Sequence, residues 1–370
     1  MKELRVIISG GGTGGHIFPA VSIANAIKAL RPDAKILFVG AQGRMEMQRV
    51  PAAGYEIKGL PIRGLYRPLW KPANIGVAID FLRSRWQAKQ IIREFRPHVA
   101  VGVGGYASSA TLNAAYALRV PCLVQEQNSY AGLTNKTLAK KARKFCVAYE
   151  GMERFFPADK IMLTGNPVRQ SLLDTKLTRE DALRSLGLDG RKKTVLIVGG
   201  SLGARTINQS VLQHLDDIRQ NTDVQFYWQT GKLYSERIAV ELKQKGKPDN
   251  LLVTDFITDM GAAYKAADLV VSRSGAGSIS EFCLLGKPVI LVPSPNVAED
   301  HQTKNAMALV NRDAALFVSD ADAPQQLVPL ALTSVADAAK LQQLSENILK
   351  LALPDSAEII AKEVLKLANV

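Results

Sequence analysis

The feature that most constrains the fold is an apolar strand that runs directly into a glycine-rich loop, because this pattern occurs twice. Residues 5–9 (RVIIS) enter the loop GGGTGG at 10–15, and residues 194–198 (TVLIV) enter GGSLG at 199–203, about 190 residues later. A strand that ends in such a loop and leads into a helix begins a nucleotide-binding α/β fold. Each half of the chain is therefore predicted to begin its own parallel sheet.

Short apolar runs continue to alternate with helical patterns in both halves. The predicted strands are 5–9, 36–40, 99–102 and 122–125, then 194–198, 225–229, 251–254, 269–272, 289–292 and 315–318. We expect an N-terminal domain over 1–167, a C-terminal domain over 168–340 and a terminal helix over 341–370 that packs back on the first domain. Ligands of such sheets lie beyond the carboxyl ends of the strands, so two facing lobes would hold two substrates in one cleft.

The charge and the cysteine content limit which cellular compartments and which partners are expected. Lys and Arg exceed Asp and Glu by 47 to 34, which favours anionic partners such as nucleic acid, anionic lipid or diphosphates. The three cysteines lie far apart without a CxxC pair, as is usual in a reducing cytosol. The first residues lack the pattern of a signal peptide, so export is not expected. The uncharged stretch 99–118 is diluted by glycine and polar residues, which predicts a strand, a loop and a helix in place of a membrane span.

The first glycine loop satisfies the pattern GxGxxG through Gly10, Gly12 and Gly15, which alone is a weak signal for a dinucleotide. A dinucleotide site also needs an acidic residue at the end of the second strand, where this chain has Gly40. The loop instead offers backbone N–H groups to an anion at a helix N-terminus. His16 follows directly and is a candidate for proton transfer, with a structural histidine as the alternative.

Two further loops follow strands of the first half. Gly104, Gly105 and Tyr106 belong to a second glycine turn, which would face the same diphosphate as the first; tight packing of a strand on a helix is the alternative. Residues 125–128 (QEQN) end the next strand with four polar side chains, which is costly unless they reach a ligand. Exposure to solvent in a loop is the other interpretation.

In the second half, residues 273–281 (RSGAGSISE) leave a strand and open a helix whose N-terminus can accept a phosphate. Glu281 lies about one turn inside this helix, placed to accept hydrogen bonds from ribose hydroxyls. A capped helix with an acidic first turn is the alternative. Asp320 and Asp322 form a DxD string at a predicted helix start, where we expect them to cap the helix and not to hold a metal.

Together these motifs resemble those of MurG, a family of bacterial glycosyltransferases. The resemblance rests on seven motifs in the family's order, at residues 10–16, 104–106, 126–128, 165–169, 199–201, 273–281 and 300–302. It implies an α/β GT-B fold, with two Rossmann-like doubly wound parallel-sheet domains facing a cleft. It also implies an inverting transfer of N-acetylglucosamine (GlcNAc) from UDP-GlcNAc to the C4 hydroxyl of MurNAc in undecaprenyl-diphospho-MurNAc-pentapeptide (lipid I). The product, lipid II, is a precursor of the peptidoglycan that cells build as they grow and divide.

The resemblance further implies roles for individual residues. His16 is the first choice and Glu126 the second choice for the general base, and Gly104, Gly105 and Tyr106 would hold the acceptor diphosphate. The donor would be contacted by Thr13, Gly14, Gly15, Asn128, Arg169, Ser201, Ile257, Ala276, Gly277, Ser278, Ile279, Ser280, Glu281 and Gln302. Of these, Asn128 and Gln302 would contact the sugar, Arg169 and Ile257 the uracil region, Ser201 the diphosphate region, and residues 276–281 the phosphate and ribose. Gln125 stands where some members carry His, and His301 where some carry Gln.

A lipid acceptor requires contact with a membrane, and residues 74–95 read as one helix with two apolar faces. The face that suits the core carries Val77, Phe81, Ala88, Ile91, Ile92 and Phe95. The other face carries Ile75, Ile79, Leu82 and Trp86, beside Arg83, Arg85 and Lys89. An anionic bilayer favours such a face, so we predict peripheral binding at the cytoplasmic side of the cell membrane. A helix buried on both sides and an oligomer contact are the alternatives.

Backbone N–H groups and a helix dipole can stabilise departing UDP, so no tightly bound cofactor and no protein-bound metal are expected. Mg²⁺ would enter only in company with the diphosphate substrates, and no nucleic acid partner is expected. Three other functions stay open: a related lipid glycosyltransferase, a UDP-sugar epimerase, and a non-catalytic UDP-sugar-binding component of the division apparatus.

Overall fold

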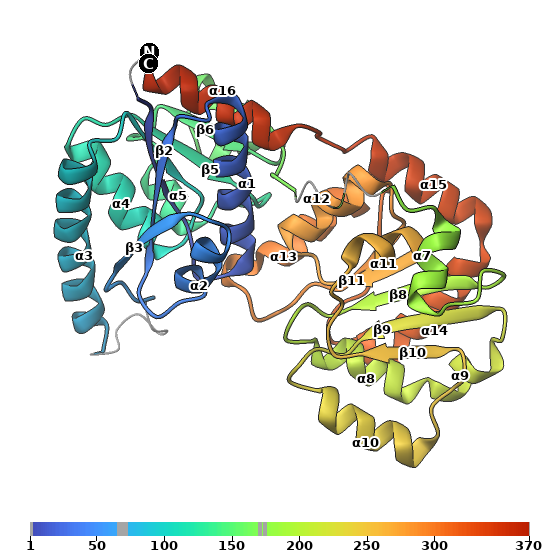
Figure 1. Cartoon of the computed structure of the whole chain (residues 1–370). Helices are drawn as coiled ribbons and strands as arrows, with labels where there is room; N and C mark the ends of the chain where they lie inside the picture. The colour runs from blue at the N-terminus through green and yellow to red at the C-terminus, as the bar shows by residue number, and fades with distance from the viewer. Residues whose placement is uncertain (1–2, 65–72, 169–171, 173–175, 370) are drawn as a thin grey trace. The chain divides into compact units, whose positions relative to one another are not determined.

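The computed structural model describes residues 3–64, 73–168, 172 and 176–369. The chain divides into two compact units, one of Met1–Arg169 with Leu353–Val370 and one of Gln170–Ala352. Figure 1 shows that each unit is a twisted sheet with helices on both faces. The repeated strand and glycine loop therefore predicted the architecture correctly.

The N-terminal unit is built on a parallel sheet in the strand order β3-β2-β1-β4-β5-β6-β7. Its strands are β1 (Arg5–Ser9), β2 (Lys35–Ala41), β3 (Glu56–Leu60), β4 (Val99–Gly102), β5 (Cys122–Glu126), β6 (Lys144–Val147) and β7 (Ile161–Leu163). Its helices are α1 (Gly14–Leu30), α2 (Glu46–Ala52), α3 (Ala73–Phe95), α4 (Tyr106–Ala117), α5 (Leu133–Thr137) and α16 (Ser356–Ala368). Both faces of the sheet are covered, so its central strands are mostly apolar. In β1, Ile7 packs into one core and its neighbours Val6 and Ile8 into the other.

The C-terminal unit repeats this plan with the parallel strand order β10-β9-β8-β11-β12-β13. Its strands are β8 (Lys193–Val198), β9 (Val224–Gln229), β10 (Leu251–Thr254), β11 (Leu269–Ser272), β12 (Val289–Leu291) and β13 (Leu316–Phe317). Its helices are α7 (Arg179–Leu186), α8 (Arg205–Gln213), α9 (Leu215–Gln220), α10 (Ser235–Lys245), α11 (Met260–Ala266), α12 (Ala276–Leu285), α13 (His301–Val310), α14 (Ala323–Ala336) and α15 (Ala338–Leu349). The buried Trp228 satisfies its indole N–H by donating to Asn208 Oδ1 at 3.0 Å.

Each sheet has one switch point, where the strand order reverses beside the first strand. It lies between β1 and β4 in the N-terminal unit and between β8 and β11 in the C-terminal unit. The loops that leave these four strands are the two glycine loops of the first half, the loop that contains Ser201, and the loop that leads to α12. The fold therefore brings the predicted site loops to the two places where such sheets bind ligands.

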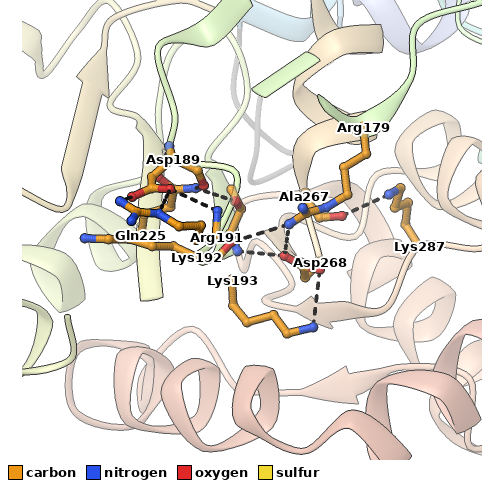
Figure 2. A network of polar contacts seen from close by, with 10 residues as sticks. Arg179, Asp189, Arg191, Lys192, Lys193, Gln225, Ala267, Asp268 and Lys287 are labelled. Carbon is orange, nitrogen blue, oxygen red and sulfur yellow. Dashed lines mark hydrogen bonds and ion pairs between the residues drawn. The ribbon is translucent and has the colours of Figure 1, made fainter. Parts of the chain in front are cut away.

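A polar network stabilises the opposite, amino-terminal edge of the second sheet (Figure 2). Asp268, directly before β11, accepts hydrogen bonds from Arg179 Nη2 and from the Thr194 backbone N–H, both at 2.8 Å. Lys287 Nζ donates to the Ala267 carbonyl at 2.9 Å, and burial lowers the pKa of this amine to about 8. This cluster joins β8, β11 and the loop before β12, and it lies away from the switch point.

All ten predicted strands exist, but three strands were missed. β3 contains Glu56 and Lys58 and is only half buried, β6 follows a run of basic residues, and β7 has three residues. The stretch 99–118 is β4, a loop and α4, as predicted. Among the helices of the described segments, none has both the length and the apolar character needed to cross a bilayer. The three cysteines are buried free thiols, and burial raises the pKa of each to about 12.

The prediction of one terminal helix over 341–370 was wrong. The segment holds two helices, because Pro354 prevents a helix from continuing through it and Asp355 adopts a left-handed φ of 58°. The first, α15, packs on α12 and α14 within the C-terminal unit. The second, α16, packs on α1. The second unit therefore ends at 352 and not at 340, and the first ends at 169 where we expected 167.

Candidate active site

The two glycine loops of the N-terminal unit lie against each other at the switch point. Val103, which follows β4, donates its N–H to Ser9 at the end of β1 at 2.8 Å. A Cβ added to Gly105 would lie 2.6 Å from the Gly11 carbonyl oxygen, and Gly105 has a φ of 86°. The second loop therefore does pack tightly, as the alternative interpretation proposed. Position 105 requires glycine because there is no space for a Cβ and because the backbone φ is positive.

His16 connects these two loops. Its Nδ1 lies 3.0 Å from the Gly11 carbonyl oxygen. A carbonyl can only accept, so Nδ1 carries the hydrogen and the neutral ring has its lone pair on Nε2. A Cβ on Gly104, whose φ is 101°, would lie 2.8 Å from His16 Nε2. The imidazole therefore lies directly on the backbone of the second loop.

The N-terminus of α1 is exposed beside His16. The helix begins at Gly14, and Thr13 at the N-cap makes no capping bond through its side chain to any described residue. Thr13, Gly15 and Gly12 are exposed, so this end of a 17-residue helix can receive an anion. Pro19 lies inside this helix, in its second turn.

Glu126 ends β5 as a buried carboxylate that organises the loop after it. Oε1 accepts from the Asn128 backbone N–H at 3.0 Å and from its side-chain amide at 3.3 Å. Oε2 accepts from the Gly132 N–H at 3.0 Å and from Asn135 Nδ2 at 2.8 Å. Four hydrogen bonds match the acceptor capacity of a carboxylate. Both oxygens of the Glu126 side chain are therefore occupied by hydrogen bonds within the protein.

The neighbours of Glu126 are also buried, so the interpretation of residues 125–127 as a solvent-exposed loop was wrong. Gln125 donates to Asn166 Oδ1 at 2.9 Å, and Asn166 donates to the Gln127 carbonyl at 3.0 Å. Gln127 in turn donates to the Val103 carbonyl at 2.7 Å. The polar end of β5 therefore supports the second glycine loop from within the unit.

In the C-terminal unit, glycines flank the N-terminus of α12. Gly275 occupies the N-cap with an extended ψ of 138° and has no side chain with which to cap the helix. A Cβ added to Gly275 or Gly277 would meet no described atom within 4 Å. The first turn contains no acidic residue, so the capped, acidic helix considered as an alternative was wrong. The arrangement is one that binds phosphate through backbone N–H groups.

Within α12 the side chains divide between the core and the ligand side. Ile279 is buried and its backbone N–H donates to the Gly275 carbonyl at 3.0 Å, so neither its side chain nor its N–H is offered to a ligand. Ser280 Oγ donates to the Ala276 carbonyl at 3.1 Å and can still accept a hydrogen bond. Glu281 is 9% exposed and accepts a hydrogen bond from Tyr264 Oη at 2.9 Å on Oε2. Tyr264, on α11, thereby fixes the rotamer of this carboxylate.

The loop that leads to α12 is held by Arg273. Its Nη1 donates to Asp320 Oδ1 at 2.5 Å and to the Val292 carbonyl at 3.1 Å. Thr206 Oγ1 donates to the same Asp320 oxygen at 2.6 Å. Asp320 is thus an ion-pair partner and not a helix cap. Asp322 occupies the N-cap of α14, but its carboxylate accepts from Ser319 Oγ and not from a helix N–H.

The remaining predicted contacts of the C-terminal unit are positioned as follows. Ser201 is exposed in the loop after β8. The side chain of Ile257 is 5% exposed, which leaves its backbone to face a ligand. Gln302 Oε1 accepts from the Ser294 N–H at 2.8 Å, so the amide orientation is fixed with its nitrogen as the outward donor. Arg169 lies outside the described residues.

The backbone is strained in the residues directly before Gln302. Glu299 and Asp300 have φ values of 56° and 51°, two consecutive left-handed residues that are not glycine. Each such residue costs on the order of 1–3 kcal/mol. Strain of this kind is concentrated at ligand sites, in keeping with the position of Gln302 at the start of α13. Across the described residues, no group of three or more His, Cys, Asp or Glu side chains is arranged to hold a metal.

Two residues that face the site were missed by sequence reasoning, Tyr264 and Glu46. Tyr264 carries no motif signal. Glu46, at the start of α2, is fully buried and accepts the Gly12 N–H at 2.9 Å. The one sequence signal for Glu46 is Gly40 near the end of β2, because a Cβ at position 40 would lie 2.6 Å from Glu46 Cγ. The glycine that argued against a dinucleotide makes room for a carboxylate from the next helix.

Comparison with known proteins agrees with this geometry. The glycosyltransferase family 28 N-terminal domain matches residues 6–147, and the family's C-terminal domain matches residues 194–360. A UDP-N-acetylglucosamine–N-acetylmuramyl-(pentapeptide) pyrophosphoryl-undecaprenol N-acetylglucosamine transferase of Bacteroides fragilis is 68% identical over 99% of this chain and 96% of its own length. The transferase of the same name from Bacteroides thetaiotaomicron is 66% identical over 100% of this chain and 99% of its own. The crystal structure of MurG from Acinetobacter baumannii superposes with a TM-score of 0.78 at 26% identity, covering 98% of this chain and 99% of that one.

The paired sheets and the anion-binding helix termini define a GT-B glycosyltransferase fold. Within that class, the chain belongs to the MurG family of glycosyltransferase family 28. The family predicted from seven short motifs is confirmed.

Proposed function

We propose that this chain transfers GlcNAc from UDP-GlcNAc to the C4 hydroxyl of MurNAc in lipid I, giving lipid II for peptidoglycan synthesis. The reaction is the one for which its full-length relatives are named. The proposal is supported by one feature of each unit: His16 lies on two glycine loops in the N-terminal unit, and glycines flank the N-terminus of α12 in the C-terminal unit. The first supplies a base for a hydroxyl acceptor, and the second a site for the donor diphosphate.

The chemical step is a single displacement. The C4 oxygen of the acceptor attacks the anomeric carbon of the donor while His16 Nε2 takes the hydroxyl proton. The bond between the anomeric carbon and the phosphate oxygen breaks, and its electron pair leaves with UDP. The new bond forms on the opposite face of the sugar, so the configuration inverts. Charge that develops on UDP is stabilised by backbone N–H groups and the dipole of α12.

Two features support His16 over Glu126 as the base. The Nδ1 contact with the Gly11 carbonyl gives His16 the tautomer with a lone pair on Nε2. Glu126 already accepts four hydrogen bonds from residues 128–135, which leaves it no comparable capacity. We therefore assign Glu126 to holding Asn128, and Asn128 to the sugar of the donor.

The donor is proposed to lie along the switch point of the C-terminal unit. Residues 276–278 offer backbone N–H groups to the phosphates, and Ser201 reaches them from the β8 loop. Glu281 accepts from the ribose hydroxyls, Ile257 contacts the uracil through its backbone, and Gln302 donates to the sugar. Thr13, Gly14 and Gly15 contact the donor from the N-terminus of α1. The acceptor diphosphate lies at Gly104, Gly105 and Tyr106. No step needs a protein-bound metal or cofactor, and Mg²⁺ comes only with the diphosphates.

The exposed face of α3 is proposed to dock on the anionic cytoplasmic surface of the cell membrane. Ile75, Ile79, Leu82 and Trp86 are 68%, 47%, 63% and 63% exposed, whereas Val77 on the other face is 4% exposed. A helix buried on both sides is thus excluded. Exposed Arg83 and half-buried Arg85 and Lys89 add positive charge that anionic lipid attracts. This places the enzyme where its lipid acceptor is embedded.

A turnover assay with the purified chain tests the function. UDP-GlcNAc with lipid I is expected to give lipid II and one equivalent of UDP, whereas UDP-GlcNAc alone is expected to stay unchanged. Formation of an epimerised UDP-sugar without acceptor would identify an epimerase. Transfer to diacylglycerol in preference to lipid I would identify a different lipid glycosyltransferase. Binding of UDP-GlcNAc without any turnover would support the non-catalytic alternative.

A further inference from the structure

We propose that Glu46 is a positioning residue for the base, acting on His16 through a single peptide group. The carboxylate is fully buried at the start of α2. Its Oε2 accepts the Gly12 N–H at 2.9 Å, and its Oε1 accepts the Ala41 N–H at 3.0 Å. The Gly11 carbonyl is the other end of the peptide that contains the Gly12 N–H. That carbonyl accepts from His16 Nδ1 at 3.0 Å. Carboxylate, peptide and imidazole therefore form one continuous chain of hydrogen bonds.

The surrounding glycines show that the structure makes space for this carboxylate. A Cβ on Gly11 would lie 2.1 Å from Glu46 Oε1, and one on Gly40 would lie 2.6 Å from Glu46 Cγ. Any other residue at either position would displace the Glu46 side chain. One buried side chain thus explains two glycines, Gly11 in the loop after β1 and Gly40 in β2.

The chemistry of the contacts also requires a carboxylate. Both partners, Gly12 and Ala41, donate N–H groups, so both Glu46 oxygens must accept. A glutamine has the same shape but offers one acceptor only. Among the described residues, Glu46 has no cationic partner to offset its burial, and an unpaired buried charge is costly.

The charge has a use at His16. A hydrogen bond from the Gly12 N–H to a carboxylate polarises the peptide and strengthens its carbonyl as an acceptor. The stronger acceptor holds His16 in the Nδ1–H tautomer, directs Nε2 to the substrate, and stabilises the imidazolium that forms when Nε2 takes a proton. In serine hydrolases an aspartate performs this task in direct contact with histidine. Here the peptide between Gly11 and Gly12 transmits the effect.

One consequence concerns the glycine loop itself. The Gly12 N–H is occupied by Glu46 and is not a donor to a diphosphate. The first loop therefore serves chiefly to hold the base, and anion binding in this unit falls to the N-terminus of α1 and the second loop.

The proposal rests on His16 as the base, and the experiment separates the two claims. Glu46→Gln is expected to lower kcat by about 10- to 100-fold, the usual effect of removing an orienting partner, with UDP affinity unchanged. The acid limb of the pH profile of kcat/KM is expected to move to lower pH, because the imidazolium loses its stabilising carboxylate. In a His16→Ala background the same substitution is expected to have no further effect. Glu363→Gln, which neutralises a buried carboxylate of α16, is the matched control and is expected to keep full activity.

Three results would overturn the proposal. A Glu46→Gln variant that keeps its kcat and pH profile would show that the contact is only structural. Additive losses in the double variant would show that Glu46 does not act through His16. The third test uses the wild-type chain, so it does not depend on whether a variant folds. If nitrogen NMR of the four histidines shows the Nε2–H tautomer for His16, the hydrogen-bond chain from Glu46 to His16 is excluded. By contrast, if His16→Ala lowers kcat by less than about tenfold, His16 is not the base, but the hydrogen bonds that join Glu46 to His16 are not called into question.

Discussion

The assignment of Glu281 to the donor ribose predicts how its loss changes affinity. Tyr264 donates to Oε2 of this carboxylate at 2.9 Å and orients it, and we expect the carboxylate to accept at least one charge-assisted bond from the ribose. Such a bond contributes about 1.5–3 kcal/mol, which corresponds to about 10- to 150-fold in affinity. Glu281→Ala should therefore weaken UDP binding by that factor.

Tyr264→Phe supplies a graded companion to this change. The phenylalanine keeps the ring that packs edge-on against Phe282 at 5.6 Å between centroids, and removes only the hydroxyl that orients Glu281. A lost orienting hydrogen bond costs about 0.5–1.5 kcal/mol, so affinity should fall by about 2- to 10-fold. In the Glu281→Ala background, Tyr264→Phe should have almost no further effect on affinity.

Isothermal titration calorimetry with UDP and with UDP-GlcNAc measures these changes, and thermal unfolding checks that each variant is folded. Glu346→Ala, an exposed glutamate on α15 of the same unit, is the control and should bind as wild type does. Unchanged UDP affinity in a folded Glu281→Ala variant would refute the ribose assignment. Equal losses in Glu281→Ala and Tyr264→Phe would show that the tyrosine itself contacts the nucleotide.

Three further predictions concern the base, the membrane and the second sheet. His16→Ala should lower turnover by about 10²- to 10⁴-fold with UDP binding intact; a loss below about tenfold would show that His16 is not the base. Ile79→Glu with Trp86→Glu should abolish binding to anionic vesicles and activity on embedded lipid I while sparing a soluble acceptor analogue, whereas Leu233→Glu with Val240→Glu, also at exposed apolar sites, should not. Vesicle binding that survives, or a wild-type chain that is a dimer through α3, contradicts docking by this face. The pKa of Lys287, lowered by burial to about 8 from 10.5, means that the unfolded chain binds more protons between these values. The contribution of Lys287 to stability should therefore rise by about 3 kcal/mol from pH 8 to 10.5. Urea unfolding should show this as a change in the stability difference between wild type and Lys287→Met, because the three buried cysteines titrate alike in both.

The sequence predicted the two sheets because their strands are continuous apolar runs beside glycine loops, which leaves few alternatives for residues 5–15 and 194–203. It predicted that the motif loops gather at one edge of each sheet because the carboxyl ends of parallel strands meet there. It did not predict which polar groups face a ligand. Glu126 and Glu281 both looked like ligand groups in the sequence, yet the donors from residues 128–135 that occupy Glu126 come together only in the folded loop.

Contacts between residues that are far apart in the sequence also could not be predicted from the sequence. Glu46 meets Gly12 across 34 residues, and neither position suggests the other. Similarly, Asp320 looked like a helix cap because it precedes α14, but it pairs with Arg273, which is 47 residues away. In both examples a carboxylate pairs with a residue far away in the sequence, and local sequence rules describe only neighbours.

The glycine loops of the two units look alike in sequence but use glycine for different reasons, and this difference can be tested. Gly11 is required by packing, since a Cβ would lie 2.1 Å from Glu46 Oε1, whereas a Cβ on Gly277 would meet no described atom within 4 Å. In the second position of α12, alanine should even stabilise the helix, by up to about 1 kcal/mol. A helical Cβ tilts toward the N-terminus, so the new methyl group would point at a phosphate bound there.

Gly277→Ala should therefore melt at the same or a higher temperature than wild type and yet raise the KM for UDP-GlcNAc, with little change in the KM for lipid I. Gly11→Ala should do the reverse: it should melt lower, because Glu46 is displaced, and lose kcat with donor affinity retained. Differential scanning calorimetry and steady-state kinetics on the pair measure both effects. A Gly277→Ala variant with unchanged donor KM would mean that the phosphates do not lie at the α12 terminus, whatever anion-binding geometry that terminus offers.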